Sequence, residues 1–315
     1  MNSPRILIAG SGAVGAVYAA HLEQAGCYVS FLVRDRNAAN AQMPRDLHRF
    51  RMLGKPRSVT QDIPCIETIE GEWDQLWLCL PSTALETEWL GRRLQELDQQ
   101  TPLLSWTPDI RDRQRLEARY RGPVSQGLIG LLSFQSPLPD TDMQEQGFAY
   151  LLPPMAAAVV DASPAGRQAA DWLNKGGLAT RTSEQLPWLA ARGSAVMINS
   201  IAALELSGWS FRELRAGDNL TLAAQAAREA IRASALDLGT DPGMAEKLPY
   251  RSLLSMLLAA GPALSPVPLE AYMKFHFSKV GKQTRMMLDS WLILAEEHQV
   301  PAPALSELRR RLGSV

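Results

Sequence analysis

The chain has 315 residues, a net charge of −1 and 46% hydrophobic residues, which is enough apolar material for two globular cores. A nearly neutral chain with a pI near 6.5 has no electrostatic basis for binding nucleic acid or an anionic membrane. The three cysteines, Cys27, Cys65 and Cys79, are isolated and form no disulfide framework, so we expect a reducing, cytoplasmic environment.

The first predicted element is a short strand from Ile6 to Ala9, whose apolar, β-branched composition is typical of a buried parallel strand. A G-x-G-x-x-G turn follows, in which the glycines permit a tight turn, close approach to a pyrophosphate and packing of a helix on the strand. The helix carries His21 on its apolar face, where a core histidine is expected, and ends at Gly26. Tyr28 to Val33 is predicted as a second strand.

This order of strand, glycine turn, helix and strand predicts a dinucleotide-binding site rather than a plain glycine turn. The residues expected to contact the dinucleotide there are Gly10, Ser11, Gly12, Ala13, Val14 and Gly15.

The end of the second strand predicts which dinucleotide binds. NAD sites usually carry an acid about 20 residues past the glycines, which accepts from the ribose 2′-OH. This chain has Arg34 at that position and Arg36 two residues later. A guanidinium attracts a 2′-phosphate, so the pattern favours NADP(H). Two alternatives stay open: the arginines are solvated loop charges, and Asp35 turns inward to a hydroxyl.

Two further strands are predicted to end at the same edge of the sheet. Residues 37–54 are polar and basic; they either cover the adenosine end of the site or, as we favour, form a solvated surface segment. The strand at 76–80 ends in Leu80 and Pro81, and the strand beginning at Leu103 is followed by Thr107. The carboxyl ends of parallel strands face the ligand crevice, so we expect these residues to contact the cofactor.

The remaining pattern separates two domains. Strands are predicted at 124–132 and 148–152, joined by a turn at 136–142. From Thr182 onward the strand signal disappears, and a long helix from Pro187 to Leu206 is followed by a second that Asp218 caps. We therefore predict a Rossmann-type doubly wound α/β sheet in residues 1–180 and an all-helical C-terminal domain in residues 181–315. The apolar stretch 253–269 is interrupted by prolines and is not expected to span a membrane.

These residues resemble those of the ketopantoate reductase (2-dehydropantoate 2-reductase) family over nearly the full length. The resemblance rests on the glycine turn, Arg34 and four later segments: 147–153 (GFAYLLP), Ile198-Asn199, 211–215 (FRELR) and 281–284 (GKQT). It implies an NADPH-binding Rossmann-type domain, a helical domain for substrate and dimerisation, reduction of a 2-keto acid, and often a homodimer.

The chain departs from this family at its polar positions. The resemblance places the family's proton-donating lysine at Ala191, beside Arg192, and an asparagine at Ala195. The family's Thr-Glu-Ile-Asp reads 284–287 (TRMM) here, its His-Asn-Gly reads 106–108 (WTP), and a further lysine falls at about Ser82.

Reduction of a ketone produces an alkoxide, which needs a proton donor or a cation in the transition state. Arg192 can stabilise that charge or hold a carboxylate, but an arginine stays protonated and cannot be the acid. Asn199 can hold the substrate or the nicotinamide amide. These two residues are our candidate catalytic residues, with a salt-bridge arginine and a buried helix asparagine as the alternatives. Arg285 is a weaker candidate, and the histidines and cysteines form no metal-binding pattern.

The leading hypothesis is an NADP(H)-dependent oxidoreductase acting on a small 2-keto acid or related carbonyl compound that is less hydroxylated than ketopantoate. The alternative is an NADP(H)-binding protein without catalysis, which serves as a sensor or assembly partner. A dehydrogenase for amino or imino acids is a further enzymatic alternative.

Overall fold

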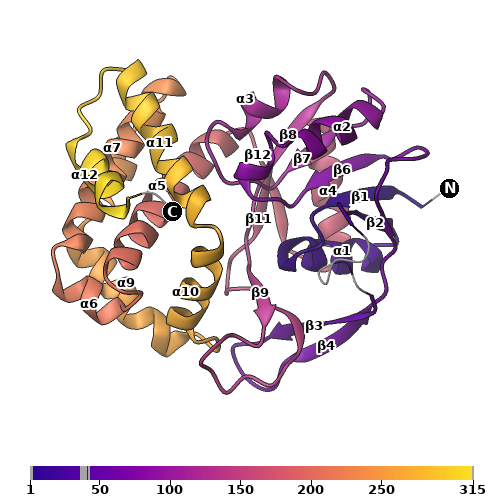
Figure 1. Cartoon of the computed structure of the whole chain (residues 1–315), viewed down its shortest axis with the longest axis horizontal. Helices are drawn as coiled ribbons and strands as arrows, with labels where there is room; N and C mark the ends of the chain where they lie inside the picture. Colours follow the sequence, from indigo (N-terminus) through magenta and orange to yellow (C-terminus); the bar gives the residue numbers. More distant parts are fainter. Residues whose placement is uncertain (1–2, 36–40, 42, 314–315) are drawn as a thin grey trace. The chain divides into compact units, whose positions relative to one another are not determined.

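A computed structural model describes residues 3–35, 41 and 43–313. The chain forms two compact units. Unit 1 comprises Met1–Leu138 and Asp142–Leu186, and unit 2 comprises Pro139–Thr141 and Pro187–Val315. Unit 1 contains the sheets and unit 2 the long helices (Figure 1). The predicted combination of a Rossmann-type α/β fold with a helical C-terminal region is confirmed.

The main sheet of unit 1 has the strand order β12-β11-β8-β7-β6-β1-β2-β5. Neighbours from β8 to β5 are parallel, in the 3-2-1-4-5-6 order of the Rossmann fold, and β11 is antiparallel to β8. The strands are β1 (Arg5–Ala9), β2 (Tyr28–Leu32), β5 (Cys65–Ile66), β6 (Gln75–Leu78), β7 (Leu103–Ser105), β8 (Val124–Leu128), β11 (Ala158–Asp161) and β12 (Thr180–Ser183).

Both faces of this sheet are covered, which explains the uninterrupted apolar composition of its central strands. Ile6 and Ile8 of β1 pack into one core with side chains of α1 (Ala13–Gln24) and α4 (Pro164–Lys175). Leu7 and Ala9 point the other way, into a core with side chains of α2 (Glu88–Glu96) and α3 (Asp112–Glu117). A short 3₁₀ turn, η2 (Ser82–Ala84), follows β6.

A second sheet has the order β4-β3-β10-β9 and lies against α1 (Figure 1). Its strands are β3 (Arg45–Phe50), β4 (Arg57–Gln61), β9 (Leu132–Ser136) and β10 (Gly147–Leu151). The favoured prediction that residues 37–54 form a solvated surface segment is wrong over residues 45–50, where Leu47 and His48 are buried. Residues 37–40 and 42 of this segment lie outside the described residues. His48 is compatible with burial because its ring nitrogens contact Ser58 Oγ and the Gln146 carbonyl oxygen, each at 2.7 Å.

The prediction of one continuous strand at 124–132 is also wrong, because this segment contributes to two strands that belong to different sheets. β8 belongs to the main sheet and β9 to the second sheet. Between them the chain passes so close to the backbone of Ala157 that a Cβ atom on Gly130 would lie 2.3 Å from its carbonyl carbon. The close packing excludes a side chain at this glycine, and hydropathy alone does not show that the strand is interrupted here.

Unit 2 is built around α7, which packs on α11 and α12. The buried Trp291 of α11 donates to Ser234 Oγ at 3.1 Å, and the Glu229 carboxylate accepts from the backbone N–H groups of Ala304 and Leu305 at the start of α12. Asp218 stands at the N-cap of α7 without a side-chain capping bond. The helices are α5 (Leu186–Leu206), α6 (Phe211–Ala216), α7 (Asn219–Asp237), α8 (Gly243–Lys247), α9 (Arg251–Leu264), α10 (Leu269–Lys279), α11 (Gly281–Glu297) and α12 (Pro303–Leu312).

By length and composition alone, α5 is apolar enough to cross a membrane, as are α9 and α10 taken as one bent segment, among the residues that the structure describes. Half of the apolar stretch of α5 is buried inside the protein, as in a core helix.

Candidate dinucleotide-binding and active site

The glycine turn between β1 and α1 lies at the point where the strand order of the main sheet reverses. β1 pairs with β2 on one side and with β6 on the other, and open α/β sheets bind ligands at such a switch point. Gly10 has φ +112°, and a Cβ atom there would lie 2.3 Å from the Cys79 carbonyl oxygen at the end of β6. A Cβ atom on Gly15 would lie 2.0 Å from the Gly10 carbonyl oxygen. Both glycines are therefore required by the packing of the turn.

Gly12 has a different environment. It is the N-cap residue of α1 with φ −77° and, as a glycine, has no side chain that could cap the helix. A Cβ atom built on it would meet no atom within 4 Å. The first-turn N–H groups of a helix lack partners within the helix, and its dipole favours an anion at this end. The turn thus offers open space and backbone donors, the arrangement that binds a pyrophosphate.

Arg34 lies just beyond the end of β2, next to this turn. Ala9, the last residue of β1, pairs with Leu32, the last residue of β2, so the two strands end level with each other. Arg34 is exposed and has no ion pair with any residue that the structure describes. Asp35 is also exposed, and Arg36 lies outside the described residues. The structure thus leaves the Arg34 guanidinium available at the edge where the predicted 2′-phosphate would lie.

The ends of β6 and β7 lie on the other side of the turn. Leu80 is half-buried, and its Cδ2 would be 3.3 Å from a Cβ on Gly10, while Pro81 is exposed. Thr107 is buried, and its Oγ1 lies 2.7 Å from Ser105 Oγ. Leu80 therefore lies beside the glycine turn, whereas the Thr107 hydroxyl is engaged with its own strand end.

A buried carboxylate, Asp112 at the start of α3, links these two strand ends. Its Oδ2 accepts from Ser82 Oγ at 2.6 Å and from the Asp109 backbone N–H at 3.0 Å, and Arg115 Nη1 donates to its Oδ1 at 2.8 Å. The side chain of Asp112 is fully buried. Asp112 is not among the predicted site residues, although an acid in the first turn of a helix that follows a strand by a short loop is a recognisable signal.

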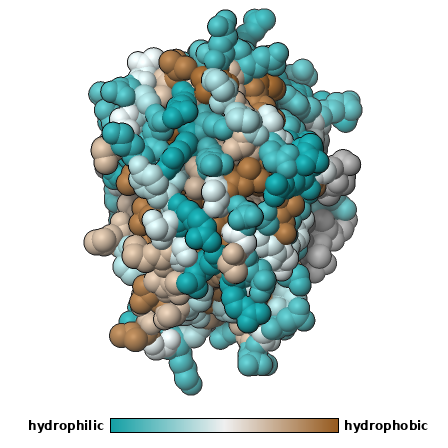
Figure 2. Space-filling model, turned by 90° about the vertical axis from the view of Figure 1, so that its left-hand side faces the viewer, coloured by the Kyte–Doolittle hydropathy of each residue, from teal (hydrophilic) through white to brown (hydrophobic). Residues whose placement is uncertain are grey.

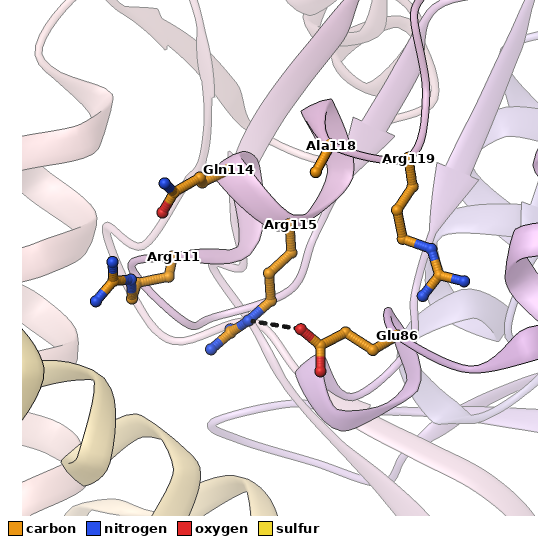
Figure 3. Close-up of a pocket in the computed structure, with 6 residues that line it drawn as sticks. All are labelled: Glu86, Arg111, Gln114, Arg115, Ala118 and Arg119. Atoms are coloured by element: carbon orange, nitrogen blue, oxygen red, sulfur yellow. Dashed lines mark ion pairs between the residues drawn. The ribbon is translucent and has the colours of Figure 1, made fainter.

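A shallow pocket of about 630 Å³ lies beside this network. Glu86, Arg111, Gln114, Arg115, Ala118 and Arg119 line it (Figure 3). Arg115 Nε lies 3.7 Å from Glu86 Oε1, and Arg119 donates to the Leu85 and Thr87 carbonyl oxygens. No predicted site residue lines this pocket, and these two guanidiniums hold α3 against the loop before α2.

The two candidate catalytic residues lie on α5 in unit 2. Arg192 and Asn199 are seven residues apart, which places them on one face of the helix with roughly 10 Å of axial rise between them. Arg192 is half-buried and makes no hydrogen bond or ion pair within the described part of the chain. Asn199 is fully buried; its Nδ2 donates to the Ala195 carbonyl oxygen at 2.7 Å, and its Oδ1 accepts from no described residue. Ala191 and Ala195 are buried as well.

Arg285, the weaker candidate, has a structural role. Its guanidinium forms a 2.7 Å ion pair with Glu205 at the end of α5. It also donates to the carbonyl oxygens of Gly281, Leu312 and Gly313. The side chain is 9% exposed, and its guanidinium is already bound to these acceptors within unit 2. A substrate contact of Arg285 is therefore not supported.

The histidines behave as core or surface groups. The ring Nδ1 of His21 lies 2.6 Å from the Gly176 carbonyl oxygen, as expected for a core histidine. Burial lowers the pKa of His21. No group of His, Cys, Asp and Glu side chains suited to a metal ion exists among the described residues.

The family model for ketopantoate reductase PanE/ApbA matches residues 6–135. No curated protein matches the chain in sequence.

Solved structures share the fold at low identity. A PanE/ApbA family ketopantoate reductase from Ralstonia eutropha JMP134 has a TM-score of 0.73 at 15% identity, with 98% of this chain and 97% of that chain covered. A ternary complex of D-mandelate dehydrogenase with NADH and anilino(oxo)acetate has a TM-score of 0.69 at 14% identity, covering 98% and 97%. Dimeric ketopantoate reductase from Staphylococcus aureus has a TM-score of 0.67 at 15% identity, also covering 98% and 97%.

Proposed function

We propose that this protein is an NADP(H)-dependent oxidoreductase that reduces a small 2-keto acid or related carbonyl compound, because the family model for ketopantoate reductase PanE/ApbA matches residues 6–135. The observation that carries this proposal is the glycine turn at the switch point of the sheet, where Gly12 leaves open space in front of the helix N-terminus. Unit 1 would bind the cofactor, and unit 2 the substrate.

NADP(H) is proposed over NAD(H) because of Arg34. A 2′-phosphate is recognised best by a guanidinium, and the Arg34 side chain is exposed and unpaired among the described residues. The structural relative D-mandelate dehydrogenase was solved with NADH, so the fold by itself does not select NADP(H). Gly10 to Gly15 would hold the pyrophosphate, with Leu80, Pro81 and Thr107 at the neighbouring strand ends.

The cofactor, when bound, supplies a hydride to the carbonyl carbon of the substrate. Arg192 is proposed to stabilise the negative charge that develops on the carbonyl oxygen or to bind the substrate carboxylate. Since an arginine does not release its proton near neutral pH, water would supply the proton. The unpaired Oδ1 of Asn199 is an acceptor for a substrate hydroxyl or for the nicotinamide amide.

The substrate is proposed to be less hydroxylated than ketopantoate. Ala191 and Ala195 are buried and carry no polar group at two of the positions where the family resemblance places polar side chains. An apolar wall leaves a substrate hydroxyl without a partner, which costs binding energy.

A titration tests the proposal directly. Purified protein is titrated with NADPH and with NADH, and ketopantoate and unbranched 2-keto acids are then added to the NADPH complex while absorbance at the nicotinamide band is followed. We expect tight NADPH binding, oxidation by at least one 2-keto acid, and loss of turnover in Arg192→Ala. Absence of binding to both dinucleotides would contradict the proposal.

A second function is favoured by the missing proton donor. In the sequence of α5, Arg192 is the only cationic side chain, and Ala191 stands where a lysine is expected. A protein that binds NADP(H) without reducing a carbonyl, as a sensor or assembly partner, would have such a site. Tight NADPH binding with no oxidation by any 2-keto acid tested, in wild type and Arg192→Ala alike, would select this function.

We also propose that the protein is a cytoplasmic homodimer with no nucleic-acid or membrane partner. All three cysteines are free, which suits a reducing compartment, and a structural relative is described as dimeric.

On the face of the helical unit turned to the viewer in Figure 2, apolar side chains reach the surface among polar ones. Exposed apolar residues of α8, α9 and the loop joining them are Met244, Leu248, Tyr250, Met256, Leu257 and Leu264. Light scattering on protein eluting from a size-exclusion column gives the molar mass and so tests the dimer. Leu257→Glu is the variant expected to disrupt it.

A further inference from the structure

Arg45 connects the second sheet to the glycine turn. It is the first residue of β3, and its Nη1 donates to the Ser11 carbonyl oxygen at 2.6 Å. Its Cζ lies 4.9 Å from the ring centroid of Phe31 on β2 and 4.7 Å from that of Phe148 on β10. The guanidinium is thus held by one backbone oxygen of the turn and by aromatic rings from both sheets.

The hydrogen bond to Ser11 determines which way the next peptide group faces. In a trans peptide the carbonyl oxygen and the following N–H point in opposite directions. With the Ser11 carbonyl oxygen turned toward Arg45, the Gly12 N–H is directed away from Arg45. If this peptide flipped, the carbonyl oxygen would take the place of a donor and would repel a phosphate oxygen.

Glycine makes such a flip easy. Gly10 and Gly12 flank Ser11, and glycine has access to more backbone conformations than any other residue. The contacts of Gly10 with Cys79 restrict one side of the turn, whereas Gly12 meets no atom within 4 Å of a built Cβ. A fixed donor on the Ser11 carbonyl oxygen therefore supplies a restraint that packing does not supply there.

We propose that Arg45 is a positioning residue for the dinucleotide: through the Ser11 carbonyl oxygen it keeps the N–H groups of the glycine turn pointing at the pyrophosphate. The inference deepens the proposed function and rests on it. Burial lowers the pKa of Arg45 to about 10, so the side chain remains a cation at neutral pH and its bond to Ser11 is charge-assisted.

The experiment compares three ligands in Arg45→Met, which keeps an unbranched side chain between the same neighbours but has no donor. We expect NADPH and NADH to bind about tenfold more weakly, the change that corresponds to loss of one charge-assisted hydrogen bond. Adenosine 2′-phosphate lacks the pyrophosphate, and its affinity should stay within about twofold. Arg45→Lys, which retains one charged donor, should lose less dinucleotide affinity than Arg45→Met.

A matched control and a readout without ligand complete the test. Arg57→Met changes an exposed arginine on the adjoining strand β4 and should alter no affinity. In protein labelled with ¹⁵N-glycine, the Gly12 amide signal, assigned by its absence in Gly12→Ala, should shift or split in Arg45→Met and stay in place in Arg57→Met. This signal tests the inference even if wild type binds no dinucleotide, which would contradict the proposed function alone.

Any one of three results would overturn the inference. An equal loss of affinity for adenosine 2′-phosphate would show that Arg45 binds the 2′-phosphate directly. Unchanged dinucleotide affinity, or an unchanged Gly12 signal, would show that the bond to Ser11 does not control the turn.

Discussion

Gly10 packs against Cys79 so closely that a Cβ atom on the glycine would lie 2.3 Å from the Cys79 carbonyl oxygen. Gly12, two residues later in the same motif, would place a Cβ atom in open space. The two glycines are therefore required for different reasons. The fold itself excludes a side chain at Gly10, whereas only a bound ligand would exclude one at Gly12.

This difference predicts opposite outcomes for two alanine variants. Gly10→Ala combines a positive φ with a steric clash and should lower the free energy of unfolding by about 2 kcal/mol or more. Gly12→Ala should change it by less than about 0.5 kcal/mol but weaken NADPH binding at least about tenfold, because its methyl group would occupy the space of the pyrophosphate. Chemical denaturation and NADPH titration of both variants check this. A Gly12→Ala protein with wild-type affinity would place the phosphates elsewhere.

Arg34 should determine the preference for NADPH over NADH. Removing its guanidinium in Arg34→Ala should weaken NADPH binding by about tenfold or more, since a charge-assisted bond to the 2′-phosphate is lost. NADH affinity should change little, and Arg34→Asp should bind NADH in preference. Dissociation constants for both cofactors in wild type and the two variants measure the effect. An equal loss of affinity for NADPH and NADH in Arg34→Ala would contradict recognition of the 2′-phosphate by Arg34.

Arg285 should affect stability and not catalysis. Arg285→Met leaves Glu205 without its buried partner and should destabilise the protein by about 3 kcal/mol. Adding Glu205→Met should restore much of that loss, since the unpaired charge is then absent. The exposed pair of Arg212 and Glu213 is the control, and Arg212→Ala should cost less than about 1 kcal/mol. Urea denaturation of the four proteins gives the free energies, and a failure of the double variant to recover stability would contradict this role.

His276 should make the protein less stable in acid. Burial, and then the nearby Lys279, lower its pKa from 6.5 to about 4. The unfolded chain therefore binds a proton more readily than the folded chain, so stability is fully present above pH 6.5 and falls as the pH drops toward 4. The contribution is about 2 kcal/mol, since the side chain is not completely shielded from solvent.

The test uses His276→Gln, with His298→Gln as the control. His298 lies at the surface of unit 2 beside Asp237. Between pH 7 and pH 4 the free energy of unfolding should fall less in His276→Gln than in wild type, and His298→Gln should behave as wild type. Identical pH dependence in His276→Gln and wild type would show that this histidine does not carry the effect.

The sequence by itself determined the features that depend on local order and spacing. The G-x-G-x-x-G turn between a buried strand and a helix, the second strand ending before Arg34, and the loss of strand signal after Thr182 each follow from neighbouring residues. Periodicity also located the long helices of unit 2, because a helix shows its buried face in every turn. His21 was recognised as a core histidine for the same reason.

Only the tertiary structure decided the features that depend on residues far apart in the chain. Residues 45–50 pair with β10, about 100 positions away, so their own polar composition does not show that they form a strand. Asp112 joins two strand ends, and Arg45 reaches Ser11 from another sheet. The structural role of Arg285 depends on the carbonyl oxygens of Leu312 and Gly313, which lie far from it in the sequence. Hydrogen bonds and close packing act over a few ångströms in space, and a sequence specifies only which residues are neighbours along the chain.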